Sequence, residues 1–147
     1  MTNNAIISKL YEASRAGVQI DMIVRGVCCL IPGVEGMSEN IRVISIVDKF
    51  LEHPRIYIFE NDGSPKMYIS SADWMTRNID NRIEVACPIL DKNLQQELLD
   101  TFMISWNDNV KARLVNTADQ NAFVQSKGEL IRSQWATYDY FSTKLSE

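Results

Sequence analysis

The residues best suited to chemistry lie in one stretch of the sequence, residues 51–82. This stretch holds the only histidine of the chain, His53, and Arg55 follows two positions later. It ends in a cluster of hydroxyl, carboxylate, amide and guanidinium groups: Ser70, Ser71, Asp73, Thr76, Arg77, Asn78, Asp80 and Arg82. A titratable imidazole among guanidiniums and small hydroxyl donors suits the recognition of oxyanions, phosphate above all. The stretch therefore predicts a phosphate-binding site.

A second candidate lies upstream, at Arg25. Residues 18–25, VQIDMIVR, are rich in β-branched side chains and predict a strand that ends at this arginine. Proteins of the α/β class build their sites at the carboxyl ends of strands. Each candidate also has an ordinary alternative: a structural role for His53, and salt bridges to nearby carboxylates for Arg25, Arg77 and Arg82. The sequence contains no Walker loop and no GxGxxG, GxSxG or HExxH pattern.

The elements that must position these groups alternate between helices and strands, which predicts an α/β layer structure. We expect helices at 4–16, 41–52, 91–106 and 129–145, and strands at 18–25, 55–60, 66–71, 82–89 and 110–115. Residues 61–65 are a turn that joins two strands into a hairpin, Pro88 predicts a strand end or an edge strand, and 73–81 and 117–127 are expected to be irregular. The stretch 41–52 is ambiguous, because its apolar residues follow helical spacing while IRVISIV is β-branched; we favour the helix.

Composition indicates one globular domain. The chain has 147 residues, 46% of them hydrophobic and 23% charged. A net charge of −4 argues against a general nucleic-acid binder. No signal peptide opens the chain and no apolar run approaches the roughly 18 residues of a membrane span, so we expect a soluble protein. Cys28, Cys29 and Cys87 lack the spacing of a zinc site or a disulfide framework and are expected to be buried, reduced thiols.

The residues now named carry a family resemblance. The motifs RGxCxLxPG, SENIR, FLEHxR and SSADWMTRN closely resemble the C-terminal domain of bacterial polyphosphate kinase, the long, histidine-phosphorylated type. The match runs over about residues 9–115, and the final helix is similar too. The resemblance implies an α/β fold like that of phospholipase D, with a mixed sheet flanked by helices. It also implies that residues 1–147 are a single domain excised from a longer enzyme and shortened slightly at the amino-terminal side.

By this resemblance, the full-length enzyme reversibly transfers the terminal phosphate of ATP to inorganic polyphosphate and uses Mg²⁺. No carboxylate cluster in this sequence has a spacing that identifies the Mg²⁺ ligands. The family's contacts to the nucleotide phosphates fall on Arg25 and His53. The phosphohistidine nucleophile belongs to a preceding domain, so the isolated chain is expected to be inactive. Arg55, Arg77 and Arg82 are candidates for guiding polyphosphate, on sequence proximity alone. The expected partners are ATP, ADP, polyphosphate, the preceding domains of the same enzyme and further copies in a homo-oligomer. The expected location is the cytoplasm, with peripheral membrane association left open.

Two other functions stay open. His53-x-Arg55, together with Ser71-Ala72-Asp73 and Asn78, looks like a diverged phospholipase D motif, in which His-x-Lys precedes a Gly-Ser-x-x-Asn turn. Arginine replaces the lysine and Ser70 replaces the glycine, which weakens a phosphodiesterase interpretation and suits a phosphate clamp. The alternatives are therefore a phosphodiesterase with His53 as nucleophile, and a non-catalytic assembly module with a vestigial site.

Overall fold

The computed structural model describes residues 1–118 and 121–145. In chain order its elements are α1 (Asn4–Arg15), β1 (Ile20–Ile23), β2 (Ile41–Ile46), β3 (Ile56–Phe59), β4 (Lys66–Ser70), α2 (Thr76–Asn81), β5 (Ala86–Ile89), α3 (Lys92–Trp106), β6 (Ala112–Val115) and α4 (Ser133–Lys144). This alternation confirms the α/β class. Among the described residues, no helix is both long and apolar enough to cross a bilayer.

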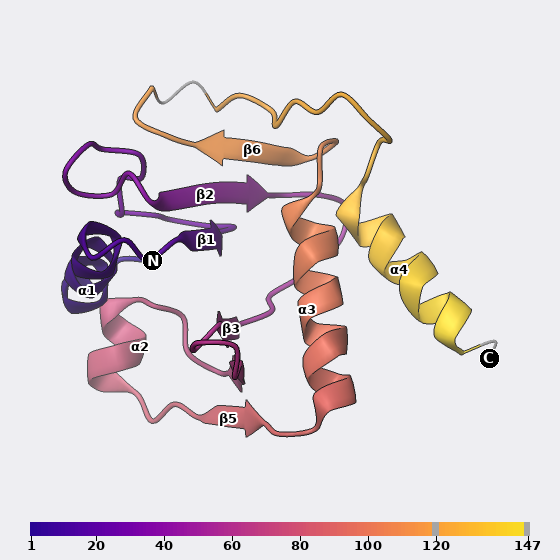
Figure 1. Cartoon of the computed structure of the whole chain (residues 1–147), viewed down its shortest axis with the longest axis horizontal. Helices are drawn as coiled ribbons and strands as arrows, with labels where there is room; N and C mark the ends of the chain where they lie inside the picture. Colours follow the sequence, from indigo (N-terminus) through magenta and orange to yellow (C-terminus); the bar gives the residue numbers. More distant parts are fainter. Residues whose placement is uncertain (119–120, 146–147) are drawn as a thin grey trace.

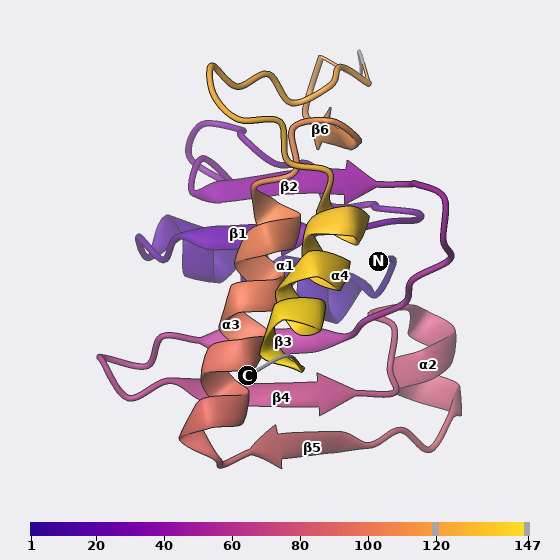
Figure 2. The ribbon, with the colours of Figure 1, turned by 90° about the vertical axis from the view of Figure 1, so that its right-hand side faces the viewer.

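The strands form two small sheets that lie in one layer. The first, β1-β2-β6, is mixed as expected, because β1 runs parallel and β6 antiparallel to β2. The second, β3-β4-β5, is antiparallel. Figure 2 shows the strands in the spatial order β6, β2, β1, β3, β4, β5. The facing edges of β1 and β3 form no ladder within the described part of the chain, so the expected sheet is present in two pieces.

Helices cover both faces of this layer, with α3 and α4 on one side and α1 and α2 on the other (Figure 1). Asn3 caps α1, and its side chain accepts a hydrogen bond from the backbone N–H of Ile6. The main apolar core lies between α1 and the first sheet, where Leu30, Ile41 and Val43 are nearly inaccessible to solvent. This core fixes the position of β1 and therefore of the loop that follows it.

The helix predicted at 41–52 is wrong. Residues Ile41–Ile46 form β2, the central strand of the first sheet. A strand with neighbours at both edges and apolar layers on both faces needs apolar residues on both sides of the pleat. Ile41, Val43 and Ile44 are all buried, and this mixture of odd and even positions imitates helical spacing.

Other boundaries differ less. The segment 73–81, expected to be irregular, contains the short helix α2. The strand expected at 82–89 is shortened to Ala86–Ile89, and it is an edge strand as Pro88 predicted. The last helix begins at Ser133, not at 129. Within 117–127, residues 119–120 lie outside the described residues, and the described part is irregular apart from a bridge between Phe123 and Arg113.

The cysteines are less buried than expected. Cys29 and Cys87 are exposed, so the prediction of buried thiols is wrong for both. Cys28 is partly buried, and this burial raises the pKa of its thiol.

Candidate functional site

The candidate site is built on residues 47–55, the linker between β2 and β3 that carries His53. The start of α4 and the residue before it hold this linker in place through hydrogen bonds. The buried carboxylate of Asp48 accepts two hydrogen bonds from Arg132, at 2.6 and 2.7 Å. The Gln134 side chain is buried and bonds the N–H and C=O of Phe50 at 2.9 and 2.8 Å. The backbone just ahead of His53 is therefore fixed by residues more than 80 positions away in sequence.

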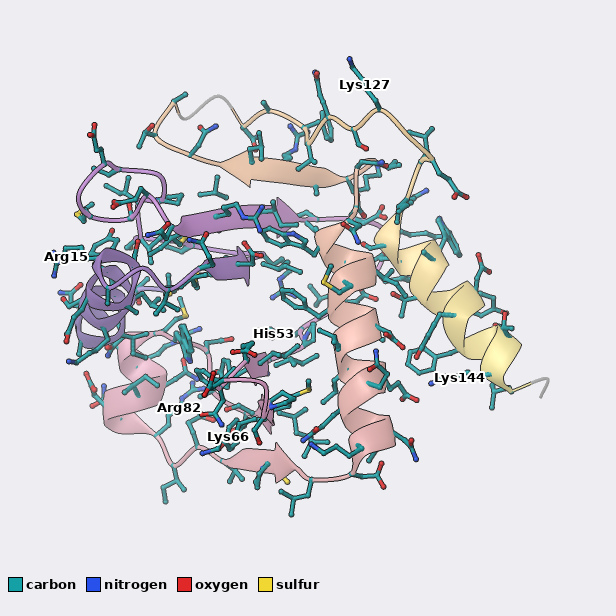
Figure 3. All side chains as sticks on the ribbon, viewed as in Figure 1. Arg15, His53, Lys66, Arg82, Lys127 and Lys144 are labelled. Carbon is teal, nitrogen blue, oxygen red and sulfur yellow. The ribbon has the colours of Figure 1, made fainter. Side chains whose placement is uncertain are left out.

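Arg25 approaches the same linker from the end of β1. Its Nη1 donates a 2.5 Å hydrogen bond to the backbone oxygen of Glu52, the residue that precedes His53. The rest of the Arg25 side chain is exposed. Figure 3 shows His53 between the levels of β1 and β3, in the middle of the molecule. The structure thus places the Arg25 guanidinium on the backbone of the residue that precedes His53 in the chain.

His53, Arg55 and Asp73 form one cluster. His53 Nε2 lies 2.7 Å from Asp73 Oδ1, and Arg55 Nε donates to the same oxygen at 2.9 Å. The second ring nitrogen, His53 Nδ1, lies 3.2 Å from Arg55 Nη2. Burial alone raises the pKa of Asp73, but the hydrogen bonds from Arg55 and His53 outweigh it and hold this pKa below its usual value. The carboxylate is therefore ionised, and both ring nitrogens are engaged.

The segment that bears Asp73 is held firmly. Tyr57 donates its hydroxyl hydrogen to the backbone oxygen of Ala72 at 3.0 Å and stacks on Trp74 with ring centroids 5.0 Å apart. The backbone N–H of Ser70 donates to the backbone oxygen of Arg55. The open end of the β3–β4 hairpin therefore sets the distance between the His53 side and the Asp73 side of the cluster.

A second polar network lies beside this cluster. Glu84 accepts hydrogen bonds from the hydroxyl of Ser71 and from Nδ2 of the buried Asn78. These two bonds lower the pKa of Glu84, and the charges of Arg82 and Arg55 add to the effect. The network connects α2 to the loop before β5 and so supports the turn at residues 70–73.

The predicted site residues therefore separate into two groups. Arg25, His53 and Arg55 meet at the linker. Arg82 reaches this group only through its charge interaction with Glu84. Arg77 is exposed on α2, and within the described residues no interaction joins it to the other candidates.

Sequence reasoning missed two functional features. It placed Asp73 in the polar cluster but did not pair it with His53, although the hairpin prediction already placed positions 53 and 73 just beyond the same end of two paired strands. It also missed Gln134 and Arg132, for which no local sequence signal exists.

The described residues contain no group of three or more histidine, cysteine, aspartate or glutamate side chains arranged to hold a metal ion. The donors gathered at the site are mainly cationic, and its carboxylate Asp73 is already bonded to Arg55 and His53. The site residues present here therefore do not fit a Mg²⁺ ligand set, and we assign none of them to the metal.

Comparison with known proteins gives consistent similarities. The family described as Polyphosphate kinase C-terminal domain 2 matches residues 1–134. A polyphosphate kinase of Vibrio parahaemolyticus is 56% identical over 141 residues, which are 95% of this chain and 20% of that protein. The polyphosphate kinase of Escherichia coli strain K12 is 51% identical over 144 residues, 97% of this chain and 21% of that protein.

A solved structure is similar along nearly the whole chain. The crystal structure of polyphosphate kinase from Porphyromonas gingivalis superposes with a TM-score of 0.94 at 46% sequence identity, covering 98% of this chain and 22% of that one. The chain thus spans about a fifth of the length of the relatives it matches.

Proposed function

Because this chain belongs to the polyphosphate kinase C-terminal domain 2 family, we propose that it supplies phosphate-binding residues to an enzyme that reversibly transfers the terminal phosphate of ATP to inorganic polyphosphate. Arg25 and His53 bind the transferred phosphate or its neighbours. The phosphohistidine comes from a preceding domain of the same enzyme. ATP, ADP and polyphosphate are the substrates, and Mg²⁺ is held by groups other than the residues assigned here.

The observation that carries this proposal is the contact of Arg25 with the backbone of Glu52, directly before His53. Phosphoryl transfer asks the protein mainly for positioning and for positive charge around the equatorial oxygens. A guanidinium has five N–H donors and stays charged at any physiological pH. Only one donor of Arg25 is needed for Glu52, so the exposed remainder of the fork can bind phosphate oxygens beside His53.

The charge balance at the site also supports anion binding. Arg55 is paired with the ionised carboxylate of Asp73, and the Glu52 side chain on the linker accepts a hydrogen bond from Gln134. Arg25 bonds a backbone oxygen, and none of the ion pairs among the described residues includes it, so its positive charge stays available to a phosphate, although the whole chain carries a net charge of −4. We propose three arginines as polyphosphate guides: Arg55 within the cluster, Arg82 beside Glu84, and the exposed Arg77 on α2.

The experiment is alanine substitution in the full-length enzyme. Arg25→Ala and His53→Ala should each lower the turnover of ATP with polyphosphate about a hundredfold or more, the effect of losing roughly 3 kcal/mol of transition-state stabilisation. Arg15→Ala is the matched control, since Arg15 lies on α1 away from His53 (Figure 3). Near-normal turnover in both site variants, with folding intact, contradicts the proposal.

The phosphodiesterase alternative has less support from the geometry. A nucleophilic imidazole must direct a free nitrogen lone pair at phosphorus. In His53, one ring nitrogen faces the Asp73 carboxylate and the other faces the Arg55 guanidinium. This arrangement suits a held imidazole better than an attacking one.

A further inference from the structure

Three hydrogen bonds close a ring among the side chains at the linker, and one carboxylate oxygen takes part in two of them. Asp73 Oδ1 lies 2.7 Å from His53 Nε2 and 2.9 Å from Arg55 Nε. Arg55 Nη2 completes the ring at 3.2 Å from His53 Nδ1. The Asp73 and Arg55 side chains are each 24% exposed and that of His53 is 45% exposed, so the Arg55–Asp73 bond is partly shielded from water and the two bonds to His53 are more open.

The chemistry of the partners selects one tautomer of His53. An ionised carboxylate only accepts hydrogen bonds, and a guanidinium only donates them. Nε2 must therefore carry the hydrogen, and Nδ1 must present its lone pair to Arg55. The opposite tautomer would set a lone pair against the carboxylate and an N–H against the guanidinium, two repulsive contacts. In a histidine, the bond made by one nitrogen thus determines the state of the other.

We propose that Asp73 is a positioning residue: it holds His53 as the Nε2–H tautomer and, with the same oxygen, holds Arg55 against Nδ1. This inference deepens the proposed function and rests on it for its catalytic meaning. A phosphate oxygen gains a bond with Nδ1 only by displacing Arg55 and meeting a protonated ring. Asp73 is suited to support that ring, because its carboxylate stays bonded to Nε2–H when Nδ1 takes up a proton.

The rigidity of the Asp73 segment separates this role from a chance surface pair. Ala72, which precedes Asp73, is buried and its oxygen is bonded by Tyr57, while the oxygen of Trp74 accepts from the backbone N–H groups of Thr2 and Asn3. A carboxylate on such a fixed backbone can orient a side chain that lies on a linker.

The first test uses the 147-residue chain, whose only histidine is His53. Diethyl pyrocarbonate modifies unprotonated imidazole nitrogens, so the absorbance of the N-carbethoxyhistidine product reports this residue alone. The wild-type chain should react more slowly than N-acetylhistidine, and Asp73→Ala should react several-fold faster than wild type. Asp80→Ala removes an exposed carboxylate from nearby α2 and should leave the rate unchanged. Equal rates in wild type and Asp73→Ala overturn the proposal.

The second test uses the full-length enzyme and a double-mutant cycle. Asp73→Ala should lower kcat about ten- to a hundredfold, by analogy with the loss of partners that orient metal-bound histidines. In a His53→Ala background, Asp73→Ala should change kcat less than about twofold, because no ring remains to be oriented. The same loss in both backgrounds overturns the positioning role.

Folding and the proposed function are controlled separately. Circular dichroism of each variant detects loss of structure, and Asp73→Asn, which keeps the size of the side chain and one acceptor oxygen, replaces Asp73→Ala if the alanine variant unfolds. Normal turnover of His53→Ala refutes the proposed function of this site. The modification rates of the chain then still decide whether Asp73 holds the imidazole.

Discussion

Substitution of Asp108 should reveal how much stability one buried carboxylate gives to the carboxyl-terminal third of the chain. Asp108 is 0% exposed and lies between α3 and β6. Its Oδ1 accepts from the backbone N–H groups of Val110, Lys111 and Ala112 at 3.0, 2.6 and 3.0 Å. Its Oδ2 accepts from the N–H of Ser133, the first residue of α4, at 2.7 Å. One side chain therefore joins the end of α3, the start of β6 and the start of α4.

The size of the effect follows from the donors left behind. The N–H groups of Ala112 and Ser133 make buried bonds to Asp108, and a buried donor without a partner costs about 1–3 kcal/mol. Asp108→Ala should therefore lower the free energy of unfolding by roughly 2–6 kcal/mol, twice the cost of one such donor. Asp108→Asn should lower the free energy of unfolding by less, because the amide oxygen can still accept from the backbone N–H groups on one side. The amide NH₂ then faces a backbone N–H donor on the other side and cannot accept from it.

The assay is urea unfolding of the chain followed by tryptophan fluorescence, since Trp106 and Trp135 lie on α3 and α4. Asp139→Ala is the matched control, because it removes an exposed carboxylate from α4 and should change stability by no more than about 0.5 kcal/mol. Equal midpoints for Asp108→Ala and Asp139→Ala would refute the reasoning, because they would mean that the buried bonds add nothing to stability.

Two further predictions concern titration and reactivity. The hydrogen bond from Arg132 lowers the pKa of Asp48, so this pair stabilises the fold above the unfolded-state pKa of about 3.9 and loses that contribution as the pH falls through the lower folded-state pKa. Asp48→Asn should therefore reduce the loss of stability at acidic pH, measured by urea unfolding at a series of pH values. An unchanged loss of stability at acidic pH contradicts this prediction. Because burial raises the pKa of the Cys28 thiol, it should react with Ellman's reagent more slowly than the exposed Cys29 and Cys87, which a single-phase reaction of all three thiols would disprove.

Local patterns predicted the elements whose two faces differ. Helices α1 and α3 begin after the capping residues Asn3 and Asp91, and the turn expected at 61–65 is present, with positive φ at Asn61, Asp62 and Gly63. The pattern failed at β2, where burial on both faces removes the alternation that identifies a strand. The split into two sheets was also beyond these patterns, because strand order depends on contacts between distant segments.

The candidate site was predictable only in part. Residue types indicated an oxyanion site, and the strand end at Arg25 indicated where one guanidinium would lie. The distance between Arg25 and the His53 linker required the fold. The partner of His53 was easier to predict, because the hairpin places Asp73 at its open end. A carboxylate in a loop nevertheless has several local roles that sequence alone does not separate.

The bonds from Gln134 to the His53 linker show that residues far outside the signature motifs position His53. Helix α4 hydrogen-bonds the backbone of Phe50 through Gln134. Displacement of this helix by a truncation, a docking neighbour or a substitution on its outer surface should therefore loosen the linker that carries His53. Truncation or fusion at α4 should therefore shift the His53 linker without changing any residue of the FLEHxR motif.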